Sequence, residues 1–315
     1  MRVNGRTGAA GLGRCRFGAR GSVVFGRFVL AEQTTLARRG GEIESMLERL
    51  LGQTSLAGEI ASGRLSDRRP FRAPHHSATM PALVGGGARV RPGEASLAHR
   101  GVLFLDELPE FSPQVLDSLR QPLESGECVV ARANGCVSYP ARFQFVAAMN
   151  PCRCGMAGEP GFRCARGPRC ETDYRARISG PMLDRIDLRI DVPAVSAADL
   201  IGPARAEPSA AVARRVALAR EIQARRYAAL GLDRVTTNAQ CPTAMIEEVA
   251  TPDHAGAALL RDASEKLALS ARAYHRLLKV ARTLADLEGA ETVGRIHLAE
   301  AISWRMAGER QAQAA

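Results

Sequence analysis

Polar side chains stand directly after two short apolar segments of this chain. Asp106 and Glu107 follow Val102–Leu105, and Asn150 follows Gln144–Met149. An acid pair at the carboxyl end of a buried strand occupies the position where open α/β sheets bind ligands. There the first acid can orient a Mg²⁺ ion, the second can polarise an attacking water, and the amide can contact a phosphate or that water. The alternatives are an exposed acidic strand end and an asparagine that caps a turn.

Four cysteines lie close together in a stretch rich in glycine and proline. They are Cys152, Cys154, Cys164 and Cys170. Four thiolates can hold a tetrahedral Zn²⁺ ion with Zn–S bonds of about 2.3 Å, and they leave no coordination position open for catalysis. The spacing therefore predicts a structural zinc site, and four reduced loop cysteines are the alternative.

One arginine lies between two acids in the segment Ser179–Leu188. Arg185 follows Asp184 and precedes Asp187 by two positions. An arginine on a loop before a strand can reach into the phosphate site of a neighbouring subunit. The alternative is a surface arginine paired with Asp184 or Asp187.

Two adjacent histidines, His75 and His76, precede these motifs. Adjacent side chains on a strand point to opposite faces, so the pair is poorly arranged to share one ligand. The pattern favours packing or hydrogen bonding over metal ligation or DNA contact.

The segments around these residues alternate between strand and helix patterns. The apolar runs before the acid pair and before the amide are typical of strands buried on both faces. Ser112 before Pro113 predicts the start of a helix over residues 113–124. Residues 127–132 and 136–141 predict a hairpin. This alternation predicts an α/β fold with a parallel sheet.

Composition divides the chain into three parts. Residues 1–42 are rich in glycine and arginine, carry a net charge of +6 and show no periodicity, so we expect them to be disordered. Residues 43–195 are expected to form the α/β core, with the cysteine loop at 152–170. Residues 196–310 are rich in alanine, leucine and arginine and predict a helical domain.

The whole chain has 315 residues, of which 46% are hydrophobic and 24% charged, and this composition excludes wholesale disorder. Its apolar stretches are too short for a membrane span. Because it also has no recognisable secretory signal, we expect a cytoplasmic protein. The formal charge is +10, but residues 1–42 carry more than half of it. The charge is therefore weak evidence that the folded part binds nucleic acid.

In combination these motifs are far more specific than any one of them alone. In chain order they are Arg69–His76, Val102–Glu107, Gln144–Asn150 and Ser179–Leu188. This series resembles the magnesium-chelatase-like AAA+ ATPases of the ComM/YifB type. The segment Leu269–Leu287 resembles the helical lid of the same family. The resemblance implies an AAA+ α/β core of the P-loop type, incomplete at its start, followed by a helical lid domain.

The resemblance implies roles for five residues in binding and hydrolysing ATP with Mg²⁺. Asp106 and Glu107 match the Walker B acids, and Asn150 matches the sensor-1 residue. Arg185 matches the arginine finger, and Arg272 matches the sensor-2 arginine of the lid.

The resemblance also implies a homo-oligomeric ring, expected to be a hexamer, that acts on DNA. ComM proteins are associated with branch migration during natural transformation. The predicted hairpin matches an element that points into the pore of related motors. Arg132 near its tip is therefore a candidate contact to the DNA phosphate backbone. A solvated hairpin arginine is the alternative.

One motif of the family is absent from this sequence. The family cradles the ATP phosphates with a Walker A loop, G-x-x-x-x-G-K-[ST], whereas the first lysine here is Lys266. Gly13–Gly18 has the glycine spacing, but Ala19 and Arg20 follow where lysine and serine or threonine are required. Arginine is planar and bulkier than lysine, so it is no simple replacement. The Lon-protease-like amino-terminal domain of the family is also absent.

Two classes of function follow from this departure. In the first, the chain binds nucleotide as part of a DNA-remodelling motor, with impaired turnover. In the second, it is a non-enzymatic truncated remnant, or a subunit that poisons intact rings, with a zinc-stabilised loop. A true magnesium-chelatase subunit is a weaker third interpretation, because the cysteine loop and the histidine pair fit the ComM/YifB branch better.

The composition break and the lost motif suggest that residues 1–42 are a foreign or misframed start. An intact G-x-x-x-x-G-K-[ST] in another frame directly upstream would support this hypothesis. A native transcript that is continuous from Met1 would contradict it.

Overall fold

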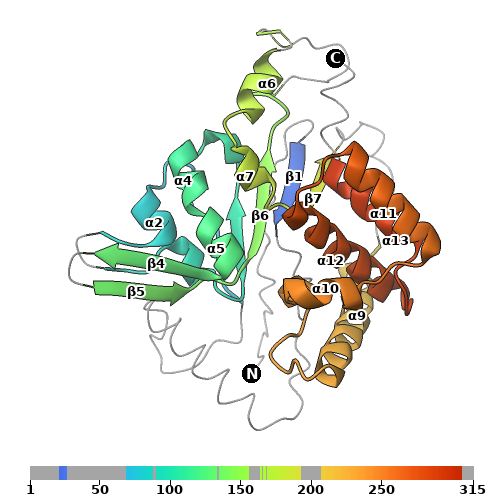
Figure 1. Cartoon of the computed structure of the whole chain (residues 1–315). Coiled ribbons are helices and arrows are strands. Elements are labelled where there is room, and N and C mark those ends of the chain that lie inside the picture. Colours follow the sequence, from blue (N-terminus) through green and yellow to red (C-terminus); the bar gives the residue numbers. More distant parts are fainter. Residues whose placement is uncertain are drawn as a thin grey trace, which may run out of the picture.

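The computed structural model describes residues 69–87, 90–132, 135–155, 164, 166–167, 169–192 and 207–306, together with the backbone of a strand at Gly21–Gly26. The described chain forms an α/β part and a helical part that lie side by side (Figure 1). The predicted α/β fold followed by a helical region is confirmed.

A five-stranded sheet forms the centre of the α/β part, in the order β2-β3-β6-β1-β7. Its strands are β1 (Gly21–Gly26), β2 (Phe71–Arg72), β3 (Val102–Leu105), β6 (Gln144–Met149) and β7 (Leu188–Val192). The three strands β2, β3 and β6 run parallel; β3 and β6 are the strands of the predicted parallel sheet, and β2 was not predicted. Strand β1 is antiparallel to both β6 and β7, so the sheet is mixed.

Strand β1, at Gly21–Gly26, lies within residues 1–42, the stretch that the sequence predicts to be disordered. Its Val-Val-Phe run between glycines has the composition of a short strand. Because β1 opposes β6, its carboxyl end at Gly26 pairs with Phe145, at the edge of the sheet opposite to Asn150. The other residues of 1–42 lie outside the described part of the chain.

Two short helices follow β3 where the sequence predicts a single one. Ser112 caps the first, α4 (Pro113–Ser118), as expected, and the second is α5 (Arg120–Ser125). The break falls at Leu119 because Pro122 has no N–H to donate and its ring clashes with the carbonyl four residues earlier. The break turns the chain, so that α5 ends beside the hairpin.

The predicted hairpin is present and forms a separate two-stranded sheet. It consists of β4 (Glu127–Arg132) and β5 (Gly135–Pro140). The remaining short elements of this part are α2 (Met80–Val84), α3 (Glu94–Leu97), the 3₁₀ helix η1 (Leu108–Glu110), α6 (Arg169–Arg175) and α7 (Gly180–Leu183).

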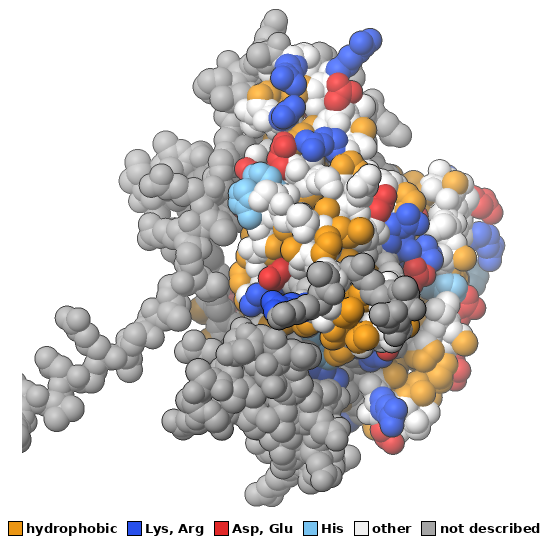
Figure 2. Space-filling model, turned by 90° about the vertical axis from the view of Figure 1, so that its left-hand side faces the viewer, with side chains coloured by type: hydrophobic (Ala, Val, Ile, Leu, Met, Phe, Trp, Pro, Cys, Tyr) orange, Lys and Arg blue, Asp and Glu red, His pale blue; other side chains and the backbone are white. Residues whose placement is uncertain are grey.

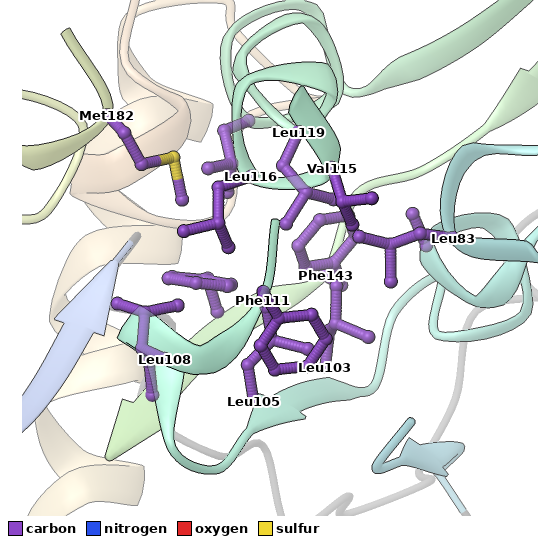
Figure 3. Packing of buried hydrophobic residues seen from close by; sticks show 14 of the residues in the cluster. Leu83, Leu103, Leu105, Leu108, Phe111, Val115, Leu116, Leu119, Phe143 and Met182 are labelled. Carbon is purple, nitrogen blue, oxygen red and sulfur yellow. The ribbon is translucent and has the colours of Figure 1, made fainter. Parts of the chain in front are cut away.

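The core of the α/β part packs β3 against η1 and α4. Leu103 and Leu105 of β3 are fully buried, and Figure 3 shows them beside Phe111 and below the α4 side chains. Fully burying one such side chain contributes roughly 1.5–3 kcal/mol. This packing fixes the carboxyl end of β3, and with it the residues that follow.

The helical part packs around one central helix, α12 (Ala271–Glu288). Its buried residues include leucines as well as the charged side chains of Arg282 and Asp286. The other helices are α9 (Ser209–Ala229), α10 (Thr243–Val249), α11 (His254–Lys266) and α13 (Arg295–Met306), with the 3₁₀ helix η2 (Asn238–Gln240). Among the residues that the structure describes, no helix is long and apolar enough to cross a bilayer.

Polar contacts and one shared core join the two parts. Leu188 of β7 belongs to the hydrophobic cluster of the helical part. The Arg276 guanidinium donates to Asp187 at 2.5 Å, and Arg305 donates to Asp184 at 3.0 Å. The helical part is therefore fixed to the segment that carries Arg185.

Candidate functional site

The predicted acid pair and amide follow two neighbouring parallel strands. Leu105 of β3 pairs with Ala147 of β6, so Asp106, Glu107 and Asn150 emerge from the same edge of the sheet. Both acids are exposed, and Asn150 is half-buried. We call these three residues the acid edge. Their arrangement leaves carboxylate oxygens open to a cation, as hard divalent ions require.

Glu107 has an unusual backbone conformation. Its φ of 51° and ψ of 47° place it in the left-handed region, which is strained for a residue with a side chain. The Glu107 N–H donates to Asp106 Oδ1 at 2.9 Å, and the next residue, Leu108, is fully buried in η1. The buried leucine holds the turn in place. Strained residues of this kind cluster at functional sites.

His76 contacts the second acid. Its Nδ1 lies 3.2 Å from Glu107 Oε2, and its ring contacts that of His75 with 4.0 Å between centroids and 35° between the ring planes. These contacts are of the hydrogen-bonding and packing kind that the sequence favours for the histidine pair. Figure 2 shows histidine side chains next to acidic ones on this face, with a group of basic side chains above them. The sequence pattern did not place His76 at the acid edge.

The helix after the cysteine loop packs against the same region. Arg177 Nη1 donates to Glu110 at 3.1 Å, at the end of η1. Burial raises the pKa of Tyr174 in α6 to about 12, and the negative charges of Glu110 and Glu107 act in the same direction. The position of α6 is therefore coupled to the acid edge.

The four predicted zinc ligands come together in space. Their sulfur atoms all lie within 4.8 Å of one another. The Sγ atoms of Cys152 and Cys154 are 3.1 Å apart, as are those of Cys154 and Cys164, too far for a disulfide bond. A zinc ion with Zn–S bonds of about 2.3 Å requires sulfurs roughly 3.8 Å apart at tetrahedral angles. The cluster therefore fits a zinc ion after small side-chain adjustments.

Two tight turns present these sulfurs. The Gly155 N–H donates to the Cys152 carbonyl at 3.0 Å, and the Gly167 N–H donates to the Cys164 carbonyl at 2.9 Å. Both glycines have positive φ, 77° and 73°, which residues with a side chain rarely adopt. The fourth ligand, Cys170, is carried by α6. A bound ion would thus connect the loop after Asn150 to the helix beside the acid edge.

The two predicted arginines meet at a residue that the sequence did not single out. Arg185 Nη2 and Arg272 Nη2 each donate to one oxygen of Glu124, in both cases at 2.5 Å. Arg185 also donates to the carbonyls of Arg120 and Pro181, at 3.1 and 2.7 Å. We call the group of Glu124, Arg185 and Arg272 the Glu124 junction.

This geometry corrects the alternative of a surface arginine paired with Asp184 or Asp187. The Arg185 side chain is only 6% exposed, and its carboxylate partner is Glu124. Asp184 and Asp187 instead bind Arg305 and Arg276 of the helical part. The sequence could not predict these three ion pairs, because the two members of each pair lie far apart along the chain.

Glu124 is held in its charged form. Partial burial raises its pKa, but the hydrogen bonds and positive charges of Arg185 and Arg272 outweigh that effect, so the net pKa lies below its usual value. A cavity of about 620 Å³ lies beside the junction and is lined by Glu124, Arg185, Arg120 and Asp117 among others. The junction is thus accessible from solvent on one side.

Within one chain, the two arginines contact groups other than the acid edge. The polar contacts that fix Arg185 and Arg272 go to Glu124 and to two carbonyls, and among the described residues none goes to the acid edge. In Figure 1, α6 stands at the top of the view, and α5 and α12 lie below it.

Arg132, the predicted DNA contact, is the last residue of β4 and pairs with Gly135. The two residues at the tip of the hairpin lie outside the described part of the chain. The hairpin itself presents exposed apolar side chains, Val129 and Val137.

Family models match both parts of the chain. The model described as "Magnesium chelatase, subunit ChlI" matches residues 20–200, and the one described as "Magnesium chelatase, subunit ChlI C-terminal" matches residues 206–305. The first match takes in residues 20–42, so the hypothesis of a foreign start is not supported for that stretch.

Three curated proteins are similar in sequence to most of this chain. Competence protein ComM of Haemophilus influenzae is 50% identical over 239 residues, which cover 76% of this chain and 45% of the relative. Protein YifB of Escherichia coli is 46% identical over 241 residues, covering 76% and 46%. A Mycobacterium bovis protein is 42% identical over 289 residues, covering 89% and 56%.

The chain spans about half the length of these relatives. The family matches nevertheless extend over most of its residues, and the strand-end acids and the helical part lie within them. The chain belongs to the magnesium-chelatase-like AAA+ family and is similar to its ComM and YifB members.

Proposed function

We propose that this chain is a subunit of a ring-forming ATPase that remodels DNA, and that its turnover is impaired. One observation carries the proposal. The acid edge and the two arginines are both built in the structure, but the described polar contacts of the arginine side chains go to Glu124 and backbone carbonyls and not to the acid edge. We infer that a nucleotide site using both groups forms between two adjacent subunits of a homo-oligomeric ring, expected to be a hexamer.

The acid edge suits the nucleotide half of such a site. Asp106 would hold Mg²⁺ through an open carboxylate oxygen, Glu107 would orient and deprotonate water, and Asn150 would contact the terminal phosphate. His76 restrains the Glu107 carboxylate by its contact at 3.2 Å. ATP with Mg²⁺, when bound, supplies the phosphoryl group and neutralises charge on its oxygens.

The Glu124 junction suits the opposite half. Arg185 and Arg272 present guanidinium groups, which bind phosphate oxygens through paired N–H donors. We assign them to the phosphates bound at the acid edge of the neighbouring subunit. Because α12 carries Arg272, nucleotide binding there would be coupled to the position of the helical part.

The four cysteines would hold a structural zinc ion. Cys152 and Cys170 are buried, and all four sulfurs lie within 4.8 Å of one another, close enough to share one tetrahedral ion. The ion would fix α6, which packs beside Glu107 and Glu110. Its role would be to position the acid edge rather than to take part in the reaction.

Impaired turnover follows from the sequence upstream of β2. No G-x-x-x-x-G-K-[ST] pattern occurs in the 315 residues. Strand β1 also ends, at Gly26, at the edge of the sheet opposite to Asn150. These facts equally favour the second candidate, a non-enzymatic remnant or a subunit that poisons intact rings.

DNA is the proposed polymer substrate, with Arg132 on the hairpin as a backbone contact. The support is similarity to a competence protein and the position of Arg132 beside the hairpin tip. DNA and ATP as substrates would place the protein in the cytoplasm. True magnesium-chelatase activity is a weaker candidate, because the ComM and YifB relatives match over a much larger share of the chain than the chelatase subunits do.

Assembly tests this proposal directly. In sedimentation velocity, Mg-ATP should convert the chain to a larger species, and Arg185→Ala should prevent that change while leaving the monomer folded. ATP hydrolysis by the chain alone should be negligible. A monomer at every nucleotide concentration would contradict the ring, and steady turnover abolished by Glu107→Gln would contradict the impairment.

A further inference from the structure

The Glu124 junction combines a buried cation with an exposed one on a single carboxylate. The side chain of Arg185 is 6% exposed, whereas those of Arg272 and Glu124 are 46% and 50% exposed. A buried guanidinium needs a counter-charge, because an unpaired charge in the interior is strongly unfavourable. Glu124 is the carboxylate that satisfies this requirement.

Both arginines are held in place by other parts of the fold. Arg185 follows α7, whose cap residue Ser179 donates to Asp117 of α4 at 2.6 Å. Arg276, one turn after Arg272 on α12, donates to the Arg185 carbonyl at 2.8 Å. The backbone segments that carry the two arginines are therefore fixed independently of Glu124, whereas their guanidinium groups meet on its carboxylate and each uses only part of its donors there.

We propose that Glu124 is a positioning residue that keeps Arg185 and Arg272 together as one paired cation site for phosphate, and that it is the internal anion with which an incoming phosphate group must compete. The inference rests on the proposed function for its biological setting. It requires only this chain for its test.

Competition follows from the geometry. The carboxylate oxygens occupy one donor of each arginine at 2.5 Å, where a phosphate oxygen would otherwise bind. The carboxylate also contributes a negative charge that repels a polyphosphate. The cavity of about 620 Å³ beside Glu124 and Arg185 gives an anion access to this point. The carboxylate thus pre-arranges the site and weakens it at the same time.

The probe for the test is inorganic triphosphate without Mg²⁺, titrated into the full chain by calorimetry. Glu124→Gln keeps the shape and a hydrogen-bond acceptor but removes the charge. Unit charges about 4 Å apart near a protein surface interact strongly enough for a change of about tenfold in affinity or more. We therefore expect Glu124→Gln to bind triphosphate at least tenfold more tightly, and Glu124→Gln with Arg272→Ala to lose that gain.

Glu127→Gln is the matched control. Glu127 is exposed, accepts a hydrogen bond from Ser138 at 2.8 Å and lies three positions from Glu124. The substitution removes the same charge from the same region without touching either arginine, so its affinity should stay within about twofold of the parent. Tightening of equal size in both variants would reduce the effect to overall charge and overturn the proposal, as would unchanged affinity in Glu124→Gln.

A further variant keeps the test decisive if Glu124→Gln does not fold. Arg272→Ala removes a half-exposed side chain and should lower triphosphate affinity at least fivefold. Unchanged affinity would overturn the paired site. Mg-ATP titrated against Asp106→Ala reports on the acid edge, whereas triphosphate without Mg²⁺ titrated against the Glu124 and Arg272 variants reports on the junction, so a failed ATPase proposal and a failed Glu124 proposal give different results.

Discussion

Carboxylates in the helical part and at the acid edge differ in burial and in the number of hydrogen bonds that they accept. In the helical part Asp286 is fully buried, and its carboxylate accepts hydrogen bonds from Arg226, Arg282 and Asn238. At the acid edge Asp106 and Glu107 are exposed. The contacts that the structure describes for their carboxylates are the Glu107 N–H on Asp106 and the His76 ring on Glu107.

The difference separates charges that hold the fold from charges that remain open to a ligand. A buried ion is tolerated only where its hydrogen-bonding capacity is filled, and filling it leaves nothing for a ligand. An exposed carboxylate with open oxygens contributes little to stability but can take up a cation. The Glu124 junction lies between these extremes, because it is satisfied internally yet half-exposed.

The largest effect should come from the buried network. Replacing Asp286 with alanine leaves Arg282 buried without its carboxylate, and breaking such a pair costs about 3–5 kcal/mol. Urea unfolding followed by circular dichroism would measure the loss. Asp262→Ala, at an exposed position of α11, is the control and should change stability by no more than about 0.5 kcal/mol. Equal effects of the two variants would break the comparison.

Metal removal should have the next largest effect. The purified chain is expected to contain about one zinc ion, and chelation should lower the thermal midpoint by roughly 5 °C or more, given about 2–4 °C per kcal/mol for a protein of this size. Cys170→Ser should abolish metal retention as measured by elemental analysis. Cys136→Ser, at an exposed cysteine of β5, should retain it. Retention of the ion by Cys170→Ser would contradict the zinc site.

Relief of backbone strain at Glu107 should have a smaller effect, of opposite sign. Glycine adopts positive φ without strain, so Glu107→Gly should raise the free energy of unfolding by about 0.5–1 kcal/mol. Glu107→Ala removes the carboxylate but keeps the strained φ, and it should be nearly neutral. Destabilisation by both variants would mean that the acid edge supports the fold after all.

The smallest effect concerns pH at the Glu124 junction. Its arginines hold the pKa of Glu124 below the ordinary value of 4.5 despite partial burial. A depressed carboxyl pKa gives stability that is complete above the ordinary pKa and disappears as pH falls through the folded-state value. The stability difference between the parent and Glu124→Gln should therefore be constant from neutral pH to about pH 5 and shrink below it. A difference that grows with acidification would contradict this linkage.

Local signals predicted the acid edge and the cysteine cluster because each depends on residues close in sequence. Strand ends place Asp106 and Asn150, and two tight turns with glycine gather the cysteines. The partners of Arg185 could not be predicted, because Pro122 breaks the expected helix and carries Glu124 to a position that only the three-dimensional packing defines.

The antiparallel direction of β1 could not be predicted from the sequence either. A short apolar run between glycines fits a parallel or an antiparallel neighbour, and the choice depends on how the chain enters the sheet. The sequence also could not predict the partner of His76. Its type suggested a hydrogen bond, but its partner Glu107 lies far along the chain and is turned by an unusual φ.

Calorimetric titration with Mg-ATP would show whether the acid edge is a nucleotide site that survives without a Walker A loop. We expect binding with a dissociation constant below about 1 mM that requires Mg²⁺ and is lost in Asp106→Ala. Absence of heat at millimolar ATP from a folded, metal-quantified sample would contradict the nucleotide site, as would equal binding by Asp106→Ala. Absence of heat would leave a protein with the fold of its family but without a working nucleotide site, whereas equal binding by Asp106→Ala would place the bound nucleotide away from the acid edge.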